Sequence, residues 1–390
     1  MLGLVLAPML AISQARTPAP CPDVKIDLSG LRVLEEMDFE SMAELRELKS
    51  LAVLEDLKGL KDLAGLGDLA ELRHLAVIGQ TGPGQTGNLE TTEAMFDAEK
   101  RKTVDKTFKV SSKDALNIEN QWGKVHVNTW DKSEIRVKVD VIARAATDER
   151  AQMMLDNISI VESREGNVHS FRTKKEPMRI NGNNSNRSLE INYTIYMPAA
   201  NAIAVKNSFG DVYMASMKGK VDIDVKYGAL KCERLANAGN TVKITYGSGN
   251  CAYINGGNIS AAYADMKVEE AGGLQGSSSY SDFSVGSLQE AMEMELKYGS
   301  FRVDNISNNI RKISLDSGFT PISLNFADNA AFNFDVNVKF GNFNVDKSFV
   351  TITSLEKDYT SAAYKGKFGS ASPKAVVNIS SRYGDVKFTK

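Results

Sequence analysis

An aromatic residue followed by a small one recurs at nearly constant spacing through the second half of this 390-residue chain. The steps between successive pairs are 18, 19, 17, 17 and 18 residues, from Phe209-Gly210 through Tyr227, Tyr246, Tyr263, Tyr280 and Tyr298. Self-similarity at one short period is typical of repeat architectures, in which each unit covers only its neighbours. This spacing constrains the fold more than any other feature of the sequence.

The residues around each aromatic predict two short strands joined by a corner. Apolar residues four positions before the aromatic share its parity, whereas those five positions after it have the opposite parity. Because alternate residues of a strand face the same side, this switch requires a bend. The small residue is expected at the bend, since glycine adopts the backbone conformations that bends need. We therefore expect a mainly β protein, a parallel β-solenoid (β-helix) with coils of 17–19 residues.

Stacked coils place equivalent residues above one another, so the aromatics should form a ladder along one corner. After a degenerate coil at Ser317-Gly318, the series continues with Phe340, and later aromatics follow 24 and 19 residues on. An earlier coil, Leu116–Val127, fits the same template with Trp122-Gly123 at its corner. The predicted ladder is Trp122, Phe209, Tyr227, Tyr246, Tyr263, Tyr280, Tyr298, Phe340, Tyr364 and Tyr383.

Two cysteines occupy the same position in neighbouring coils. Cys232 and Cys251 each lie five residues after an aromatic, which predicts that they are stacked neighbours. Neighbouring strand positions fall within the separation that a disulfide tolerates. A disulfide and a pair of buried free thiols both fit the sequence.

The chain before the solenoid divides by composition. Residues 1–15 are apolar and uncharged and end in small residues, which predicts a signal peptide and export to the periplasm, the cell surface or the medium. Residues 16–78 form a Leu-rich helical segment with a leucine at every third position from Leu45 to Leu75. A period of three spreads leucine around the whole helix. The segment is therefore either a low-complexity arm or a self-association or docking element. Residues 79–102 have the composition of a flexible linker.

Residues 103–390 are expected to form the solenoid domain, with 131–200 as an insertion or an N-terminal cap. Within that region a short helix is expected between Thr147 and Asn157, where acidic residues suit the first turn. The last coil ends near Phe388 without an evident capping helix. Such an end would leave an open edge able to pair with another chain.

The residue pattern of the repeats resembles that of a known protein family. The segments Phe209-Gly-Asp-Val212 and Tyr383-Gly-Asp-Val386, the Phe108-Lys-Val opening and the short helix after a long strand are similar to the bacterial putative-adhesin family of β-strand-repeat proteins. The resemblance covers roughly residues 103–390. It implies a β-solenoid in an envelope setting, without assigned biochemistry, and it supplies no catalytic motif.

Motifs of catalysis and of cofactor binding are weak in this sequence. His74, His126 and His169 fall in three separate segments, which argues against a metal cluster or a catalytic triad. The glycines at 82, 84 and 87 have dinucleotide-site spacing but not the strand and helix that such a site needs. We therefore expect no enzyme, no cofactor and no metal site.

Four aspartates share one position, two residues after an aromatic: Asp211, Asp265, Asp282 and Asp385. They could line one face of the solenoid, as carboxylates do in carbohydrate-active β-helix enzymes. Aspartate beside glycine is, however, ordinarily a turn-forming residue. The catalytic interpretation is accordingly the most remote of those considered.

Charge and hydropathy narrow the choice of partner. The chain has 47 basic and 49 acidic residues, intermixed along its length, which argues against nucleic acid. Beyond the N-terminus no stretch approaches the ~20 apolar residues of a membrane span. We expect a non-catalytic, adhesin-like envelope module that binds a glycan or an envelope protein. The alternative is a self-associating scaffold, a homo-oligomer formed through the Leu-rich segment or the open solenoid end.

Overall fold

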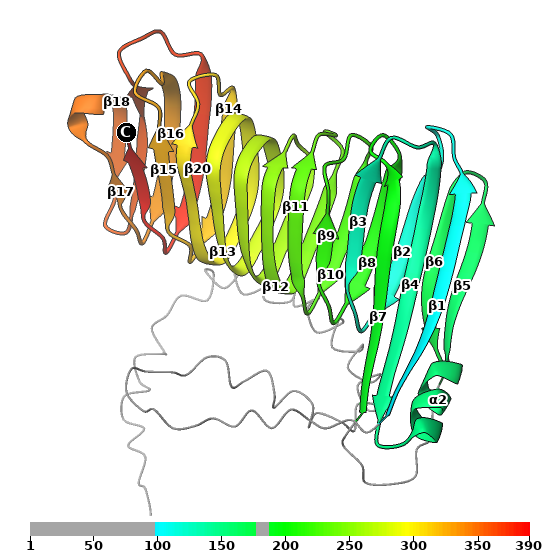
Figure 1. Cartoon of the computed structure of the whole chain (residues 1–390). Helices are drawn as coiled ribbons and strands as arrows, with labels where there is room; N and C mark the ends of the chain where they lie inside the picture. Colours follow the sequence, from blue (N-terminus) through cyan, green and yellow to red (C-terminus); the bar gives the residue numbers. More distant parts are fainter. Residues whose placement is uncertain (1–97, 177–186) are drawn as a thin grey trace, which may run out of the picture. The chain divides into compact units, whose positions relative to one another are not determined.

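The computed structural model describes residues 98–176 and 187–390. The segments expected as signal peptide (1–15), Leu-rich helix (16–78) and most of the linker (79–102) lie outside these residues. The described part is mainly β: its strands belong to one mixed sheet that does not close (Figure 1). Every pairing between successive aromatic repeats is parallel, whereas both ends of the sheet also contain antiparallel pairs.

The N-terminal end consists of eight elements: β1 (Ala98–Lys109), β2 (Ala115–Gln121), β3 (Val125–Trp130), β4 (Glu134–Ala145), α2 (Asp148–Asp156), β5 (Ile158–Glu165), β6 (Val168–Lys175) and β7 (Arg187–Pro198). β2 and β3 pair in parallel with β6 and β7, while β1–β4, β4–β7 and β5–β6 are antiparallel. Helix α2 is the helix expected here, and the Thr147 side chain caps it by accepting a hydrogen bond from the Arg150 N–H.

The linker expectation is corrected at its C-terminal end, because β1 begins at Ala98. This strand pairs with β4 along its whole length, from Ala98 opposite Ala145 to Lys109 opposite Glu134. An ion pair between Glu99 and Arg144, 2.7 Å long, joins the two strands at this end. Pairing with a distant strand thus orders residues whose local composition is that of a linker.

The central repeats comprise eight strands: β8 (Ala202–Ser208), β9 (Val212–Met214), β10 (Val221–Lys226), β11 (Ala229–Leu235), β12 (Thr241–Ile254), β13 (Asn258–Ile306), β14 (Lys312–Gly318) and β15 (Ile322–Phe326). We call the strands before each aromatic corner the first face and those after it the second face. β12 and β13 continue through their corners without a break. Buried and exposed residues alternate along both faces, so the apolar core lies between them.

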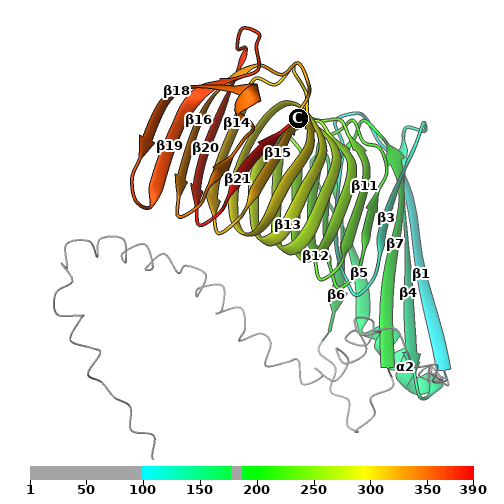
Figure 2. The same cartoon turned by 90° about the vertical axis from the view of Figure 1, so that its left-hand side faces the viewer.

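The C-terminal end contains seven elements: β16 (Phe332–Lys339), β17 (Phe343–Asn344), the 3-10 helix η6 (Lys347–Phe349), β18 (Val350–Lys357), β19 (Ser361–Phe368), β20 (Ala375–Arg382) and β21 (Val386–Thr389). Their order in space departs from their order in the chain. β20 lies between β14 and β16 (Figure 2). β21 lies between β15 and β17.

The expectation of an open C-terminal coil is therefore wrong. The last repeat of the sequence is an internal one, paired in parallel on both sides. Beyond β16, strands β19 and β18 add in antiparallel fashion. Strand β18 forms the outer edge of the first face at this end.

Candidate binding groove

Aromatic rings stack along the corner between the two faces. Neighbouring ring centroids are 4.6–5.0 Å apart and neighbouring planes lie within 13° of each other. Each of these side chains is 41–52% exposed. In spatial order the ladder is Phe209, Tyr227, Tyr246, Tyr263, Tyr280, Tyr298, Phe319, Tyr383 and Phe340.

Phe319 belongs to this ladder although the sequence prediction passed over it. The step from Tyr298 is 21 residues and Thr320 follows it, so neither the period nor the small residue marked it. The two apolar positions of the repeat do identify it, because Leu315 lies four residues before Phe319 and Leu324 lies five residues after it. The repeat predicted as degenerate at Ser317 therefore has its aromatic two residues later.

Two predicted members lie outside the ladder. Tyr364 lies on β19, which runs antiparallel and makes no corner, and its ring packs edge-on against Phe343 at 5.2 Å. Trp122 has the backbone conformation of a ladder residue, with φ of 60°. Its ring, however, carries the Lys175 ammonium 4.6 Å from the centroid and makes no ring contact with Phe209.

The bend lies at the aromatic itself rather than at the small residue after it. Trp122 and all nine ladder aromatics have φ between 52° and 60°, in the left-handed region. The following glycine is needed for a different reason. A Cβ at Gly228 would lie 2.2 Å from the Gly210 carbonyl oxygen of the preceding repeat, and one at Gly247 would lie 2.0 Å from that of Gly228. Close approach of neighbouring backbones thus excludes a side chain at these corners.

Stacking leaves the ring edges of the ladder exposed and covers the ring faces. An interior ring such as Tyr263 has Tyr246 on one face and Tyr280 on the other. A sugar ring stacks on an aromatic through the aromatic face, so interior rings offer no such platform. The ladder is consequently a packing device, and ligand contacts must be sought beside it.

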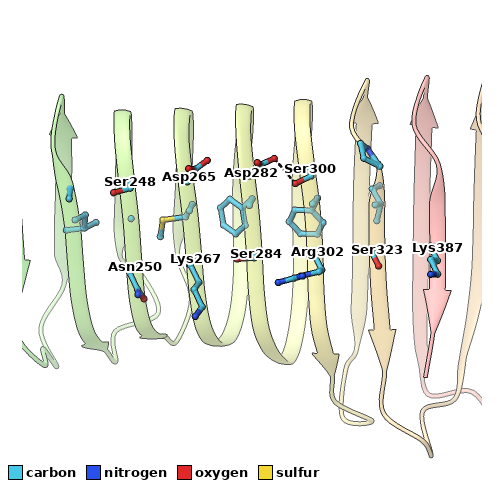
Figure 3. Close-up of a pocket in the computed structure, with 18 of the residues that line it drawn as sticks. Ser248, Asn250, Asp265, Lys267, Asp282, Ser284, Ser300, Arg302, Ser323 and Lys387 are labelled. Atoms are coloured by element: carbon cyan, nitrogen blue, oxygen red, sulfur yellow. Dashed lines mark hydrogen bonds between the residues drawn. The ribbon is translucent and has the colours of Figure 1, made fainter. Parts of the chain in front are cut away.

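A groove of about 970 Å³ runs along the second face directly beside the ladder, from β11 to β17 (Figure 3). Its lining begins two residues after each aromatic. We call the outward positions two and four residues after the aromatic the +2 row and the +4 row. Between them the strands present their backbone, because the intervening side chains, among them Met266, Phe283 and Phe301, are buried toward the core. Short side chains such as Ser248, Ser284 and Ser300 keep the groove open.

The recurring aspartates belong to the +2 row, and three of the four bind the neighbouring repeat. Asp211 accepts a hydrogen bond from the Ala229 N–H (3.0 Å), and Asp385 accepts one from the Asn342 N–H (2.8 Å). Asp282 accepts one from the Ser300 hydroxyl at 2.6 Å. Aspartate therefore recurs at this position because its carboxylate forms a hydrogen bond with the neighbouring repeat.

The fourth, Asp265, lines the groove beside Asp282, on the preceding repeat (Figure 3). No group of three metal-ligating side chains occurs in residues 98–176 and 187–390.

The histidines that the structure describes have packing roles. His169 of β6 is buried and stacks on Phe108 with ring centroids 4.0 Å apart. Burial, followed by the charge of Arg164, lowers the pKa of His169. His126 of β3 packs against Tyr213 at 4.3 Å. His74 lies outside the described residues.

Cys232 and Cys251 are register partners on β11 and β12, and both are buried. The structure records them as free thiols. A hydrogen bond with Cys251, and then burial, raise the pKa of the Cys232 thiol. The pair is therefore part of the core between the two faces.

Comparison with known proteins gives likenesses of fold only. No family model matches the chain, and no curated protein matches it. Solved structures similar to it include a putative adhesin from Bacteroides fragilis (TM-score 0.35, 13% identity) and one from Parabacteroides merdae (TM-score 0.31, 10% identity). A further one is a putative lipid binding protein from Parabacteroides distasonis (TM-score 0.24, 12% identity). Each likeness covers 74% of this chain and 97% of the other. Such TM-scores carry no argument about function.

Membrane-spanning helices were sought in the same described ranges. None of the helices there combines the length and the hydropathy that crossing a membrane requires.

Proposed function

We propose that the repeats form a parallel β-solenoid and that this domain is a non-catalytic, adhesin-like binding module of the cell envelope. Its ligand is a glycan held in the groove of the second face. The in-register parallel pairing of one repeat with the next supports the solenoid. The signal-like composition of residues 1–15 supports the envelope setting.

The groove is the observation that carries the proposal. It is open, crosses several repeats and is lined on both outward rows largely by hydroxyl, amide and charged groups. A glycan presents many hydroxyls that both donate and accept hydrogen bonds, and such a lining satisfies them along a linear chain. A protein partner would instead need apolar or aromatic anchors at the centre of the contact. The apolar side chains beneath this groove point to the core and are buried there.

Filling the groove tests the proposal. Ser284, half-buried on the second face, lines the groove, whereas Ser314, also half-buried, lies on β14 of the first face. We expect Ser284→Trp to weaken glycan binding at least ten-fold in calorimetric titration, and Ser314→Trp to leave it unchanged. The proposal fails if the wild-type chain binds no member of a broad panel of neutral and acidic oligosaccharides.

A self-associating scaffold remains the second candidate because of strand β18. In the described residues β18 pairs only with β19, so its other edge is unpaired, and its Ile352 and Leu355 are 41% and 52% exposed. Unpaired edges of this kind template pairing with another chain. This candidate predicts a concentration-dependent mass in light scattering that Ile352→Lys abolishes. A monomeric mass at all concentrations would eliminate it.

A further inference from the structure

The +4 row of the groove alternates between basic and uncharged side chains. Register pairs Lys231 with Asn250, and Asn250 with Lys267. Figure 3 shows Lys267, Ser284 and Arg302 on successive repeats, and Ser323 and Lys387 follow as register partners. The row ends with Asn344 opposite Lys387. Every second repeat along the groove therefore presents one cationic group.

Avoidance of repulsion does not by itself produce this pattern. Like charges on directly opposite strand residues destabilise a sheet, which explains why no two basic residues of this row are adjacent. Opposite charges in such positions are stabilising, so stability alone would favour acidic residues between the basic ones. The intervening residues Asn250, Ser284 and Ser323 are instead short, neutral hydrogen-bonding groups. This arrangement of cations separated by neutral donors and acceptors is therefore better explained by ligand binding than by stabilisation of the sheet.

The spacing of the cations indicates the ligand. Adjacent strands lie about 4.8 Å apart, so every second repeat advances by roughly 10 Å. One sugar unit of an extended polysaccharide advances by about one strand spacing, and a disaccharide therefore spans two repeats. Building on the proposed function, we propose that the groove binds a linear polysaccharide in which every second sugar carries an anionic group, aligned along the stack of repeats.

The acidic residues around the row sharpen this specificity. Asp265, Asp282 and Asp385 lie in the +2 row, and Glu233, Glu269 and Asp304 lie two residues after the three cations of their repeats. Five of these six carboxylates therefore lie beside the cations, and only Asp282 lies beside a neutral position, Ser284. Arg302 is bound to Asp304 at 2.9 Å, so its guanidinium is held in place while other donors stay available. A polymer with an anion on every sugar would also set charges beside Asn250, Ser284 and Ser323, where no cation meets them and where, at Ser284, Asp282 repels them.

The test uses the full chain and three oligosaccharide probes of equal length, compared by calorimetry. The first is a hyaluronan decasaccharide, which carries one carboxylate per disaccharide. The second is the same decasaccharide with its carboxylates reduced to alcohols, and the third is a galacturonate decamer, charged on every sugar. We expect the alternating probe to bind about ten-fold more tightly than either other probe, because hydrogen bonds between a cation and a carboxylate are stronger than those between neutral groups.

Point variants test whether the +4 row carries the preference for the alternating probe. Lys267→Gln should lower affinity for the alternating probe about ten-fold and leave affinity for the reduced probe unchanged. Lys243→Gln, an exposed lysine on the first face, should change neither. Equal binding of the charged and reduced probes, both lost in Ser284→Trp, would overturn the anionic specificity and leave glycan binding standing. Tighter binding of the galacturonate decamer would likewise overturn it. Absence of binding to every probe and to the wider panel would overturn both proposals.

Discussion

At the scale of single residues, the ladder aromatics combine backbone strain with ring stacking. The left-handed conformation costs an ordinary L-residue roughly 1–2 kcal/mol. Each stacked pair contributes about 0.5–1.5 kcal/mol beyond its buried area, and an interior ring such as Tyr263 makes two. The two effects are therefore of similar size. Stacking offsets the strain of the corner only while the ladder is intact.

Replacement of Tyr263 separates the two effects. Tyr263→Ala removes both stacking contacts and keeps a side chain at φ of 52°, so we expect a loss of about 1–3 kcal/mol in denaturant unfolding. Tyr263→Gly loses the same stacking but relieves the strain. It should therefore be about 1 kcal/mol more stable than the alanine variant. An alanine variant more stable than the glycine variant would contradict a strained corner.

Tyr193 makes a second prediction at this scale, for alkaline pH. Burial raises the pKa of Tyr193 to about 12, and its hydrogen bond with Thr173 acts in the opposite direction. A raised pKa means that the stability contributed by the neutral phenol is fully present below pH about 10, the unfolded value, and is lost as pH rises through about 12. Tyr193→Phe should remove roughly 2–3 kcal/mol of this alkaline loss, measured as the difference from wild type in unfolding at pH 9 to 12. Parallel pH profiles for the two proteins would refute the assignment.

At the scale of elements, the corner between two strands is set by the approach of neighbouring backbones. A left-handed backbone does not explain why glycine recurs after the aromatic, because most of these glycines have a φ that any residue can adopt. The carbonyl of the preceding repeat occupies the space of the missing Cβ at Gly210, Gly228 and Gly247. In the Phe209 and Tyr383 repeats the aromatic, the glycine and the +2 aspartate thus act together to stack the repeats.

Gly228→Ala should accordingly be far more harmful than a glycine substitution elsewhere. The new Cβ would lie 2.2 Å from a backbone carbonyl oxygen, which only a shift of the strands relieves. We expect a loss of about 3 kcal/mol or more. Gly239→Ala is the matched control, since its Cβ would lie 3.4 Å from the Asn237 side chain. Equal unfolding midpoints for the two variants would refute the steric explanation.

At the scale of the whole molecule, the strand order at the C-terminal end differs from the chain order. Because β20 and β21 insert between earlier repeats, Phe388 lies inside a cluster of phenylalanines rather than at an exposed end. Its ring lies 4.9 Å from Phe343 and 5.1 Å from Phe326. The last residues of the sequence consequently support strands on both sides of them.

Phe388→Ala tests this arrangement. A fully enclosed phenylalanine costs about 3–5 kcal/mol when it is truncated to alanine. Phe349, half-buried in η6 at the margin of the same cluster, should cost clearly less. Denaturant unfolding of both variants measures the difference. A small loss for Phe388→Ala, comparable to that of Phe349→Ala, would show that the last repeat is an open end.

The strands, the corners and the stacking of the repeats were predictable from the sequence, because each depends on a local pattern of residues. Period two identifies strands, and the parity switch around the aromatic requires a corner. A near-constant spacing implies stacking in register, because a single repeat cannot bury its apolar side. The left-handed conformation of the aromatics was not predictable from these patterns, since aromatic residues rarely adopt it.

Spatial order and the groove were decided by the tertiary structure alone. The alternation of β20 suits any position in a parallel stack, so its sequence does not say which repeats it joins. The choice depends on the antiparallel β18–β19 hairpin, which reverses the chain before β20. The cations of the groove are likewise ordinary exposed side chains when taken singly, dozens of residues apart. Only in-register stacking aligns them, because strand pairing converts a sequence period into a distance along one face.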